Sequence, residues 1–163
     1  MSNIGWPTAA LRPLARARAL AAGIPGAGLA ETTFDLPFEE AWPRLMDLER
    51  SVPASDRLVG SIEVRDRERL GDGSERLRIS TRSSFGLPQP FDVRVEDGFC
   101  LMRAAARLYV VVMAAEPDPA DAARTRYAHV EAVPRTVGRP LRRIMERVVA
   151  DDVKGFARYL EGR

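Results

Sequence analysis

The sequence predicts an α+β protein with seven antiparallel strands, two short helices after the first strand, and one long helix at its C-terminal end. Two periodicities predict this class. Between about residues 58 and 133, apolar residues mostly alternate with polar ones, as in strands that have one face in a core and one in water. From Pro140 to Leu160, apolar residues instead recur every three or four positions, as in an amphipathic helix.

A chain of 163 residues has the length of one domain and can bury a sufficient core without disulfides. We expect residues 1–28 to form an N-terminal extension and linker, and residues 29–163 to form the domain. Within the extension, Thr8 to Ala22 is rich in Ala, Leu and Arg and predicts a short helix. The glycine-rich run 23–28 predicts the linker.

The first strand and the two short helices follow this linker. Ala30 to Leu36 has the β-branched and aromatic content of a strand. Acidic residues then indicate a helix start. Apolar residues follow at i, i+3, i+4 and i+7, namely Phe38, Ala41, Trp42 and Leu45. Residues 49–57 predict a second short helix or turn around Pro53.

Six more strands complete the predicted sheet. Three alternating segments are centred on Ile62 and Val64, on Leu77 and Ile79, and on Phe91, Val93 and Val95. Tight-turn signals at 71–73 and 97–98 and a longer loop at 86–90 favour antiparallel hairpins. The remaining strands are expected at Phe99 to Ala105, Leu108 to Ala115 and Arg124 to Val133, with a polar loop at 116–123.

Composition excludes several classes of function. The net charge is only +2 and the arginines are interleaved with acids, whereas nucleic-acid binding needs a clustered basic face. No run approaches the length of a membrane span. The single Cys100 suits a reducing compartment. We therefore expect a cytoplasmic protein, monomeric or weakly dimeric, with no nucleic-acid partner.

Metal and cofactor motifs are also missing from the sequence. One histidine and one cysteine do not make a usual zinc site, and no glycine-rich stretch after a strand provides a nucleotide-binding fingerprint. Ser83, Ser84 and Cys100 have no recognisable base nearby in the sequence. We expect neither a metal nor a cofactor.

The segment Phe34-Asp-Leu-Pro-Phe-Glu-Glu-Ala-Trp42-Pro-Arg-Leu-Met-Asp47, together with the order of elements, resembles the START-like (SRPBCC) helix-grip superfamily over about residues 29–163. This superfamily includes the polyketide cyclase/dehydrase and lipid-transport families. The resemblance implies a bent sheet wrapped around the terminal helix, with a deep, mostly apolar ligand cavity between them. No catalytic motif accompanies it.

Asp152 is the sharpest candidate for a functional residue. It falls within the apolar stripe of the terminal helix, among Met145, Val149 and Phe156. A carboxylate facing an apolar cavity has a raised pKa or a paired cation, and either state can orient a ligand hydroxyl or act as an acid or base. The structural alternative is an ion pair with Arg103 or Arg126, or exposure to water at the open end of the helix.

His129, the only histidine, shares one face of its predicted strand with Tyr127 and Glu131. If that face lines the cavity, Tyr127, His129 and Asp152 form a polar cluster able to polarise a carbonyl or move a proton. If the small apolar face of Ala128, Val130 and Ala132 lies inward instead, His129 is a solvated surface residue.

The remaining ligand-binding candidates are residues that suit the walls of such a cavity. An inward Arg103 would bind a carboxylate or enolate, although an outward arginine is the commoner case. Adaptable apolar walls would come from Tyr109, Met113, Met145, Val149 and Phe156, which equally suit a plain core.

The sequence leaves two functional hypotheses. The first is a binder of a hydrophobic or polycyclic small molecule, such as a lipid, a polyketide or an antibiotic-like metabolite, in biosynthesis or self-resistance. The second is a polyketide cyclase or aromatase that uses Asp152, His129 and Tyr127 for proton transfers.

Overall fold

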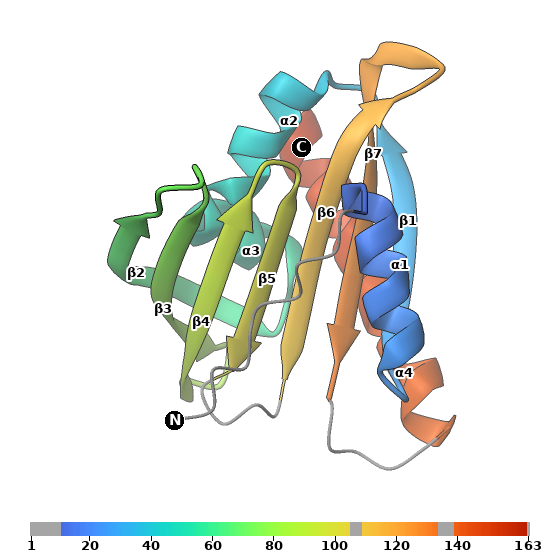
Figure 1. The fold of residues 1–163 in the computed structure, drawn as a ribbon. Helices are drawn as coiled ribbons and strands as arrows, with labels where there is room; N and C mark the ends of the chain where they lie inside the picture. Colours follow the sequence, from blue (N-terminus) through green and yellow to red (C-terminus); the bar gives the residue numbers. More distant parts are fainter. Residues whose placement is uncertain (1–10, 105–108, 134–138, 163) are drawn as a thin grey trace.

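The computed structural model describes residues 11–104, 109–133 and 139–162. The helices are α1 (Pro13–Gly23), α2 (Phe38–Met46), α3 (Leu48–Ser55) and α4 (Arg139–Glu161). The strands are β1 (Gly28–Phe34), β2 (Val59–Arg69), β3 (Glu75–Ser83), β4 (Pro88–Glu96), β5 (Phe99–Ala104), β6 (Val110–Asp118) and β7 (Asp121–Ala132). This order confirms the predicted α+β class (Figure 1).

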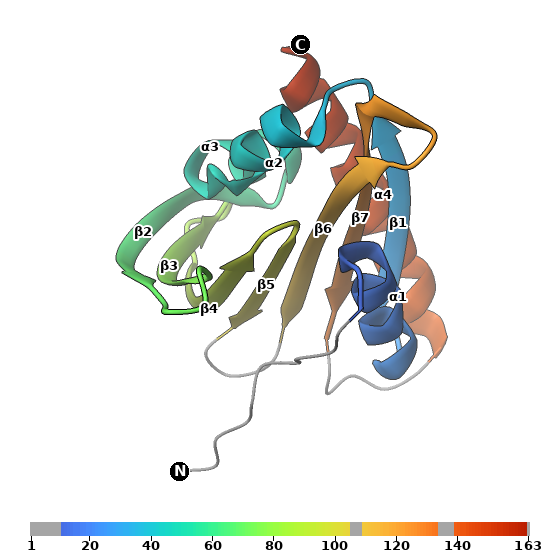
Figure 2. The same cartoon turned by 45° about the horizontal axis from the view of Figure 1, so that its top comes forward.

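All seven strands form one antiparallel sheet in the order β1-β7-β6-β5-β4-β3-β2. Strands β2 to β7 pair with their sequence neighbours, and β1 adds to the free edge of β7. The sheet curls, so that β2 bends toward α3, and α3 packs on α4 (Figure 1 and Figure 2). The concave face of the sheet is therefore covered by α2, α3 and α4.

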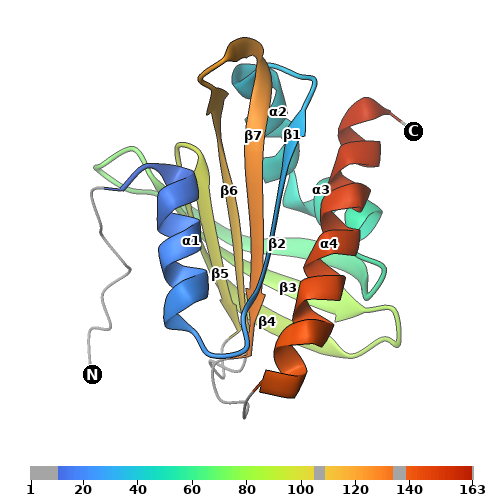
Figure 3. The ribbon, with the colours of Figure 1, turned by 90° about the vertical axis from the view of Figure 1, so that its right-hand side faces the viewer.

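Alternation along the strands produces two separate apolar cores. On the concave side, side chains such as Ile79, Val93, Met113 and Phe156 form the inner core, together with one face of α2 and α3. The opposite residues of the same strands, such as Val112 and Val130, form an outer core under α1. Figure 3 shows α1 and α4 on opposite sides of β1, β7 and β6.

The N-terminal helix packs on the outer face of the sheet. Leu14 and Ala17 of α1 are buried against β6 and β7. The guanidinium of Arg16 lies 3.8 Å from the centre of the Phe99 ring and donates a hydrogen bond of 2.5 Å to Glu96. The predicted linker leads directly into β1, whose first residue is Gly28.

Two predicted loops are partly strand in the structure. The loop predicted at 116–123 shrinks to a tight connection because β6 continues to Asp118 and β7 begins at Asp121. Both aspartates accept hydrogen bonds from backbone amides two residues ahead, which stabilises the turn locally. Residues 88–90, predicted as loop, belong to β4. They pair with β3.

Some predicted boundaries fall on residues outside the described ranges, including residues 8–10, 105 and 108. In the described part of the chain, no helix is long and apolar enough to cross a membrane.

Candidate functional site

A cavity of about 680 Å³ lies between the concave face of the sheet and helices α3 and α4. Most of its wall is apolar and comes from elements far apart in the sequence. It includes Val52, Ile62, Phe91, Met102, Val111, Met113 and Phe156. Successive side chains of a strand point to opposite faces of the sheet. The strand residues in this wall therefore point into the cavity, while their neighbours in the sequence face α1 or solvent.

One end of the cavity is open and apolar. Leu58, Phe85 and Leu87 line the cavity, yet their exposed fractions are 55%, 83% and 70%. They come from the segment between α3 and β2 and from the β3–β4 hairpin. Large apolar side chains are this exposed at few places among the described residues. These three therefore mark an entrance where a hydrophobic molecule can make apolar contacts.

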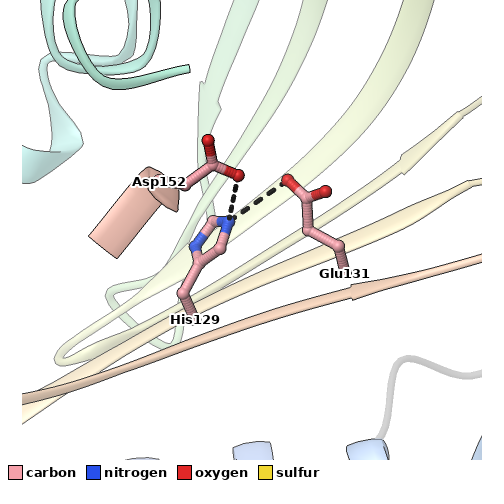
Figure 4. A group of neighbouring side chains, drawn as sticks. All are labelled: His129, Glu131 and Asp152. Atoms are coloured by element: carbon pink, nitrogen blue, oxygen red, sulfur yellow. Dashed lines mark hydrogen bonds and ion pairs between the residues drawn. The ribbon is translucent and has the colours of Figure 1, made fainter. Parts of the chain in front are cut away.

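A buried polar cluster also lines the cavity (Figure 4). His129 and Glu131 extend from β7, and Asp152 faces them from α4. The His129 Nε2 atom lies 3.2 Å from Glu131 Oε1 and 3.9 Å from Asp152 Oδ2. Only 4% of each side chain on β7 and 7% of the Asp152 side chain are exposed.

Two tyrosines hold this cluster in place. The hydroxyl of Tyr127 lies 3.1 Å from Nδ1 of His129, and Tyr109 donates a hydrogen bond to Oε2 of Glu131. Tyr127 is itself fully buried and packs against Phe34 and Phe156. The imidazole is thus bonded at both nitrogens, and both oxygens of Glu131 have partners.

The carboxyl groups of the cluster differ in their electrostatics. Burial raises the pKa of Asp152 to about 8, and the neighbouring carboxylates of Glu131 and Asp56 add to the rise. Burial also acts to raise the pKa of Glu131, but hydrogen bonds from His129 and Tyr109 outweigh it and lower the pKa below its ordinary value. Two neighbouring acids with opposite shifts can act as a proton donor and a fixed charge.

The same three residues could hold a metal ion. One ligand atom each from His129, Glu131 and Asp152 lies within 4.8 Å of the others. Nitrogen and carboxylate oxygen suit zinc, manganese or iron. The sequence argument against a metal counted only histidine and cysteine ligands and did not consider one histidine beside two acids.

The structure brings together five of the residues predicted from the sequence. The cavity wall includes Tyr109, Met113, His129, Asp152 and Phe156. Tyr127 is on the same face of β7 as His129 and contacts its Nδ1 atom, but it does not line the cavity. Asp152 faces His129 instead of either arginine considered as its partner, and Arg126 pairs with Glu116.

Three predicted wall residues lie elsewhere. Arg103 alternates with Met102 and Ala104, which belong to the inner core, so it projects from the opposite face of β5. Met145 lies where α4 crosses Gly28 of β1. Val149 is fully buried one turn farther along α4 and does not line the cavity. The apolar stripe of α4 is wide enough to cover both the sheet edge and the cavity. The sequence does not show which residues of the stripe contact the edge and which line the cavity.

Sequence reasoning missed Glu131 and Asp56 as candidates. Glu131 was detectable, because it follows His129 by two residues and so shares its face of a strand. Asp56 had no comparable signal, since it reaches the cavity from the end of α3. Of the entrance residues, Leu87 sits in the loop predicted at 86–90, and Phe85 directly precedes that loop.

No family model and no curated protein matches this sequence. Several solved structures are similar. TTHA0849 from Thermus thermophilus has a TM-score of 0.60 at 18% identity, over 83% of this chain and 97% of that one. A START superfamily protein from Mycobacterium smegmatis has a TM-score of 0.55 at 14% identity, over 84% and 95%. The protein Ara h 8.0201 has a TM-score of 0.51 at 9% identity, over 84% and 98%.

Identities this low carry information on the fold alone. The shared features are the curled antiparallel sheet, the two short helices after β1 and the long C-terminal helix. The chain therefore has the helix-grip fold of these structures, and its sheet and terminal helix enclose a mostly apolar cavity.

Proposed function

We propose that this protein binds a hydrophobic or polycyclic small molecule, such as a lipid, a polyketide or an antibiotic-like secondary metabolite, in the cavity between the sheet and α4. The observation that carries the proposal is the cavity itself, with about 680 Å³ of space and a mostly apolar wall. Ligand sites typically have this size, apolar walls and a few polar groups that fix the orientation of the ligand.

The arrangement of polar and apolar groups supports one direction of entry. Leu58, Phe85 and Leu87 mark the open end, and His129 and Asp152 lie in the buried cluster. A ligand entering between the apolar side chains meets the polar cluster with its leading end. Carriage or sequestration of such a molecule, in biosynthesis or self-resistance, is the role we propose.

Binding of the neutral fluorophore N-phenyl-1-naphthylamine tests the proposal. We expect a saturable, one-to-one rise in fluorescence. Thr81 lines the cavity and is half-buried, so Thr81→Trp should fill part of the space and weaken binding at least about tenfold, the loss expected from displaced apolar contacts.

Thr33→Trp provides the matched control. Thr33 is also a half-buried strand threonine, but alternation places it on the face of β1 opposite Phe34, away from the cavity. Thr33→Trp should bind the probe as the unmodified chain does. Equal binding by all three proteins, each shown to be folded by circular dichroism, would contradict the proposed site.

The second candidate function is an acid–base enzyme, such as a polyketide cyclase or aromatase. It is favoured by one observation, the 3.9 Å separation of His129 Nε2 and Asp152 Oδ2 on the cavity wall. A proton donor and a proton acceptor so close together can serve enolisation and dehydration of a poly-β-keto chain.

Turnover of a carrier-bound poly-β-keto chain, followed by the absorbance of an aromatic product, tests this second function. Asp152→Asn and His129→Ala should each abolish turnover while N-phenyl-1-naphthylamine still binds. Normal cyclisation by both variants would contradict the proposed enzymatic function and would not affect the proposed binding function.

A further inference from the structure

The polar cluster of the cavity is acidic. Asp56, Glu131 and Asp152 contribute carboxyl groups to the wall, and no arginine or lysine is among the described residues that line the cavity. A hydrophobic ligand that ended in a carboxylate would bring a further negative charge beside these acids, where His129, the one basic side chain among the described residues of the wall, already pairs with Glu131. The wall therefore selects against fatty-acid-like and other anionic ligands.

One acceptor in this cluster lacks a hydrogen-bond donor, because His129 Nε2 lies 3.9 Å from it. Oδ2 of Asp152 is buried and accepts no hydrogen bond from the described residues, although only 7% of the side chain is exposed to solvent. The neighbouring groups are committed to one another, with His129 bonded to Tyr127 and Glu131, and Glu131 bonded to Tyr109. Asp152 is thus the group of the cluster with an acceptor left to offer a ligand.

Three basic side chains, from α4 and from the residues just after α3, lie around a different space. Arg57, Lys154 and Arg158 line a separate polar cleft of about 450 Å³, which shares Asp56 and Asp152 with the cavity. All three are exposed to solvent, and Lys154 lies 3.3 Å from Asp151. None of these three side chains lines the cavity, so a ligand in the cavity can supply the donor to Asp152.

We propose that the ligand class of this cavity is a hydrophobic or polycyclic amine, whose protonated nitrogen donates to Asp152 while its apolar body fills the space toward Phe85 and Leu87. The inference rests on the proposed binding function and narrows it to cationic ligands. An ammonium group supplies a donor to Asp152 and a positive charge beside the acids, so its binding displaces the proton that Asp152 holds in the free protein, whereas a hydroxyl supplies only the bond.

A divalent metal ion is a less suitable occupant of the same cluster. To coordinate the metal, His129 Nε2 and Glu131 Oε1 would have to give up the 3.2 Å contact between them. An amine on Asp152 leaves that contact and the bonds from both tyrosines unchanged. The existing hydrogen bonds thus favour an organic cation over a metal.

Three fluorescent ligands with the same tetracyclic body test the inference: 1-pyrenemethylamine, 1-pyrenemethanol and 1-pyreneacetate, each titrated at pH 7. We expect the amine to bind at least about tenfold more tightly than the alcohol, as befits a buried charge-assisted hydrogen bond, and the carboxylate to bind most weakly. This comparison uses the unmodified protein and needs no variant to fold.

Asp152→Asn should remove the preference, so that the amine binds about as well as the alcohol and the alcohol binds as before. Asp151→Asn is the matched control, because Asp151 is the adjacent carboxylate on α4 and is exposed. It should keep the full preference for the amine.

The inference is overturned if the alcohol or the carboxylate binds as tightly as the amine, or if Asp152→Asn retains the preference. It is also overturned if Zn²⁺ or Mn²⁺ alone binds one-to-one in a manner that requires Asp152, since the cluster would then be a metal site. If N-phenyl-1-naphthylamine and all three pyrenes fail to bind, the proposed binding function itself is wrong. Binding of the neutral probes without a preference for the amine contradicts the amine inference alone.

Discussion

At the scale of single residues, the environment of Asp152 decides its chemistry. The stripe on α4 shows an acid among apolar residues, but its partner comes from β7, more than twenty residues earlier in the chain. That partner is the only histidine of the chain, already bonded to a carboxylate. Asp152 is therefore a protonatable group in a cavity wall, and neither arginine considered from the sequence pairs with it.

The raised pKa of Asp152 predicts a pH dependence of stability. The folded protein keeps the Asp152 proton up to about pH 8, whereas the unfolded chain releases it near its ordinary value of 3.8. The folded state then holds more protons between these limits, so the free energy of unfolding should fall as pH rises, by up to about 1.4 kcal/mol per pH unit. The lowered pKa of Glu131 acts below pH 4.5 and in the opposite direction.

Thermal melts from pH 5 to pH 8 measure this slope. Asp152→Asn should flatten the decline, and Asp151→Asn should leave it as in the unmodified chain because Asp151 is exposed. An undiminished decline in Asp152→Asn would show that another group is responsible.

At the scale of elements, close backbone contacts fix how the helices sit on the sheet and on each other. A Cβ atom placed on Gly155 of α4 would collide with the carbonyl oxygen of Ser55 and lie 2.7 Å from its Cα. This glycine lets α4 approach the end of α3, which brings Asp56 and Asp152 to the same cavity. The sequence offers no sign of it beyond a glycine within a helical pattern.

Gly155→Ala should destabilise the protein by about 1–3 kcal/mol, because the added methyl group overpacks the contact between α3 and α4. Gly23→Ala is the control, since nothing lies within 4 Å of a Cβ at that end of α1. The control should be neutral or slightly stabilising. Equal melting temperatures for the two variants would contradict the close approach.

The attachment of α1 to the sheet depends on Arg16, which is buried between Glu96 and the Phe99 ring. Arg16→Ala should lower the free energy of unfolding by about 1.5–3 kcal/mol, as expected for a lost hydrogen bond to a charged group. Arg18→Ala removes the more exposed pair with Glu31 and should cost about 0.2–1 kcal/mol. Urea melts of both variants measure the difference, and similar losses would argue against a buried anchor.

At the scale of the whole molecule, the cavity couples ligand binding to stability, because its wall combines α3, α4 and strands from both halves of the sheet. N-phenyl-1-naphthylamine at 100 times its Kd should stabilise the fold by about 2.7 kcal/mol. This corresponds to a rise in Tm of roughly 5–11 °C for a chain of this size.

Thr81→Trp should show little of this rise at the same probe concentration, and Thr33→Trp should show all of it. A rise of equal size in Thr81→Trp would place the bound probe outside the cavity.

The class and order of the elements can be predicted from the sequence, because hydrophobic periodicity is a local property. Period two along the strands and a period of three to four in the last helix follow from backbone geometry and are visible in any window of a dozen residues. The same alternation correctly grouped Tyr127, His129 and Glu131 on one face. Local chemistry also marked Asp152 as unusual.

Which face of the sheet is concave, and which residues meet across it, depends on contacts between distant segments of the chain. The curl of the sheet turned the His129 face inward and left Arg103 on the outer face, although both faces of β5 and β7 carry apolar residues. The crossing of α4 separated Met145 and Val149 from Asp152 and Phe156 within one stripe. Contacts between segments distant in the chain depend on sheet curvature and helix approach, which no local pattern encodes.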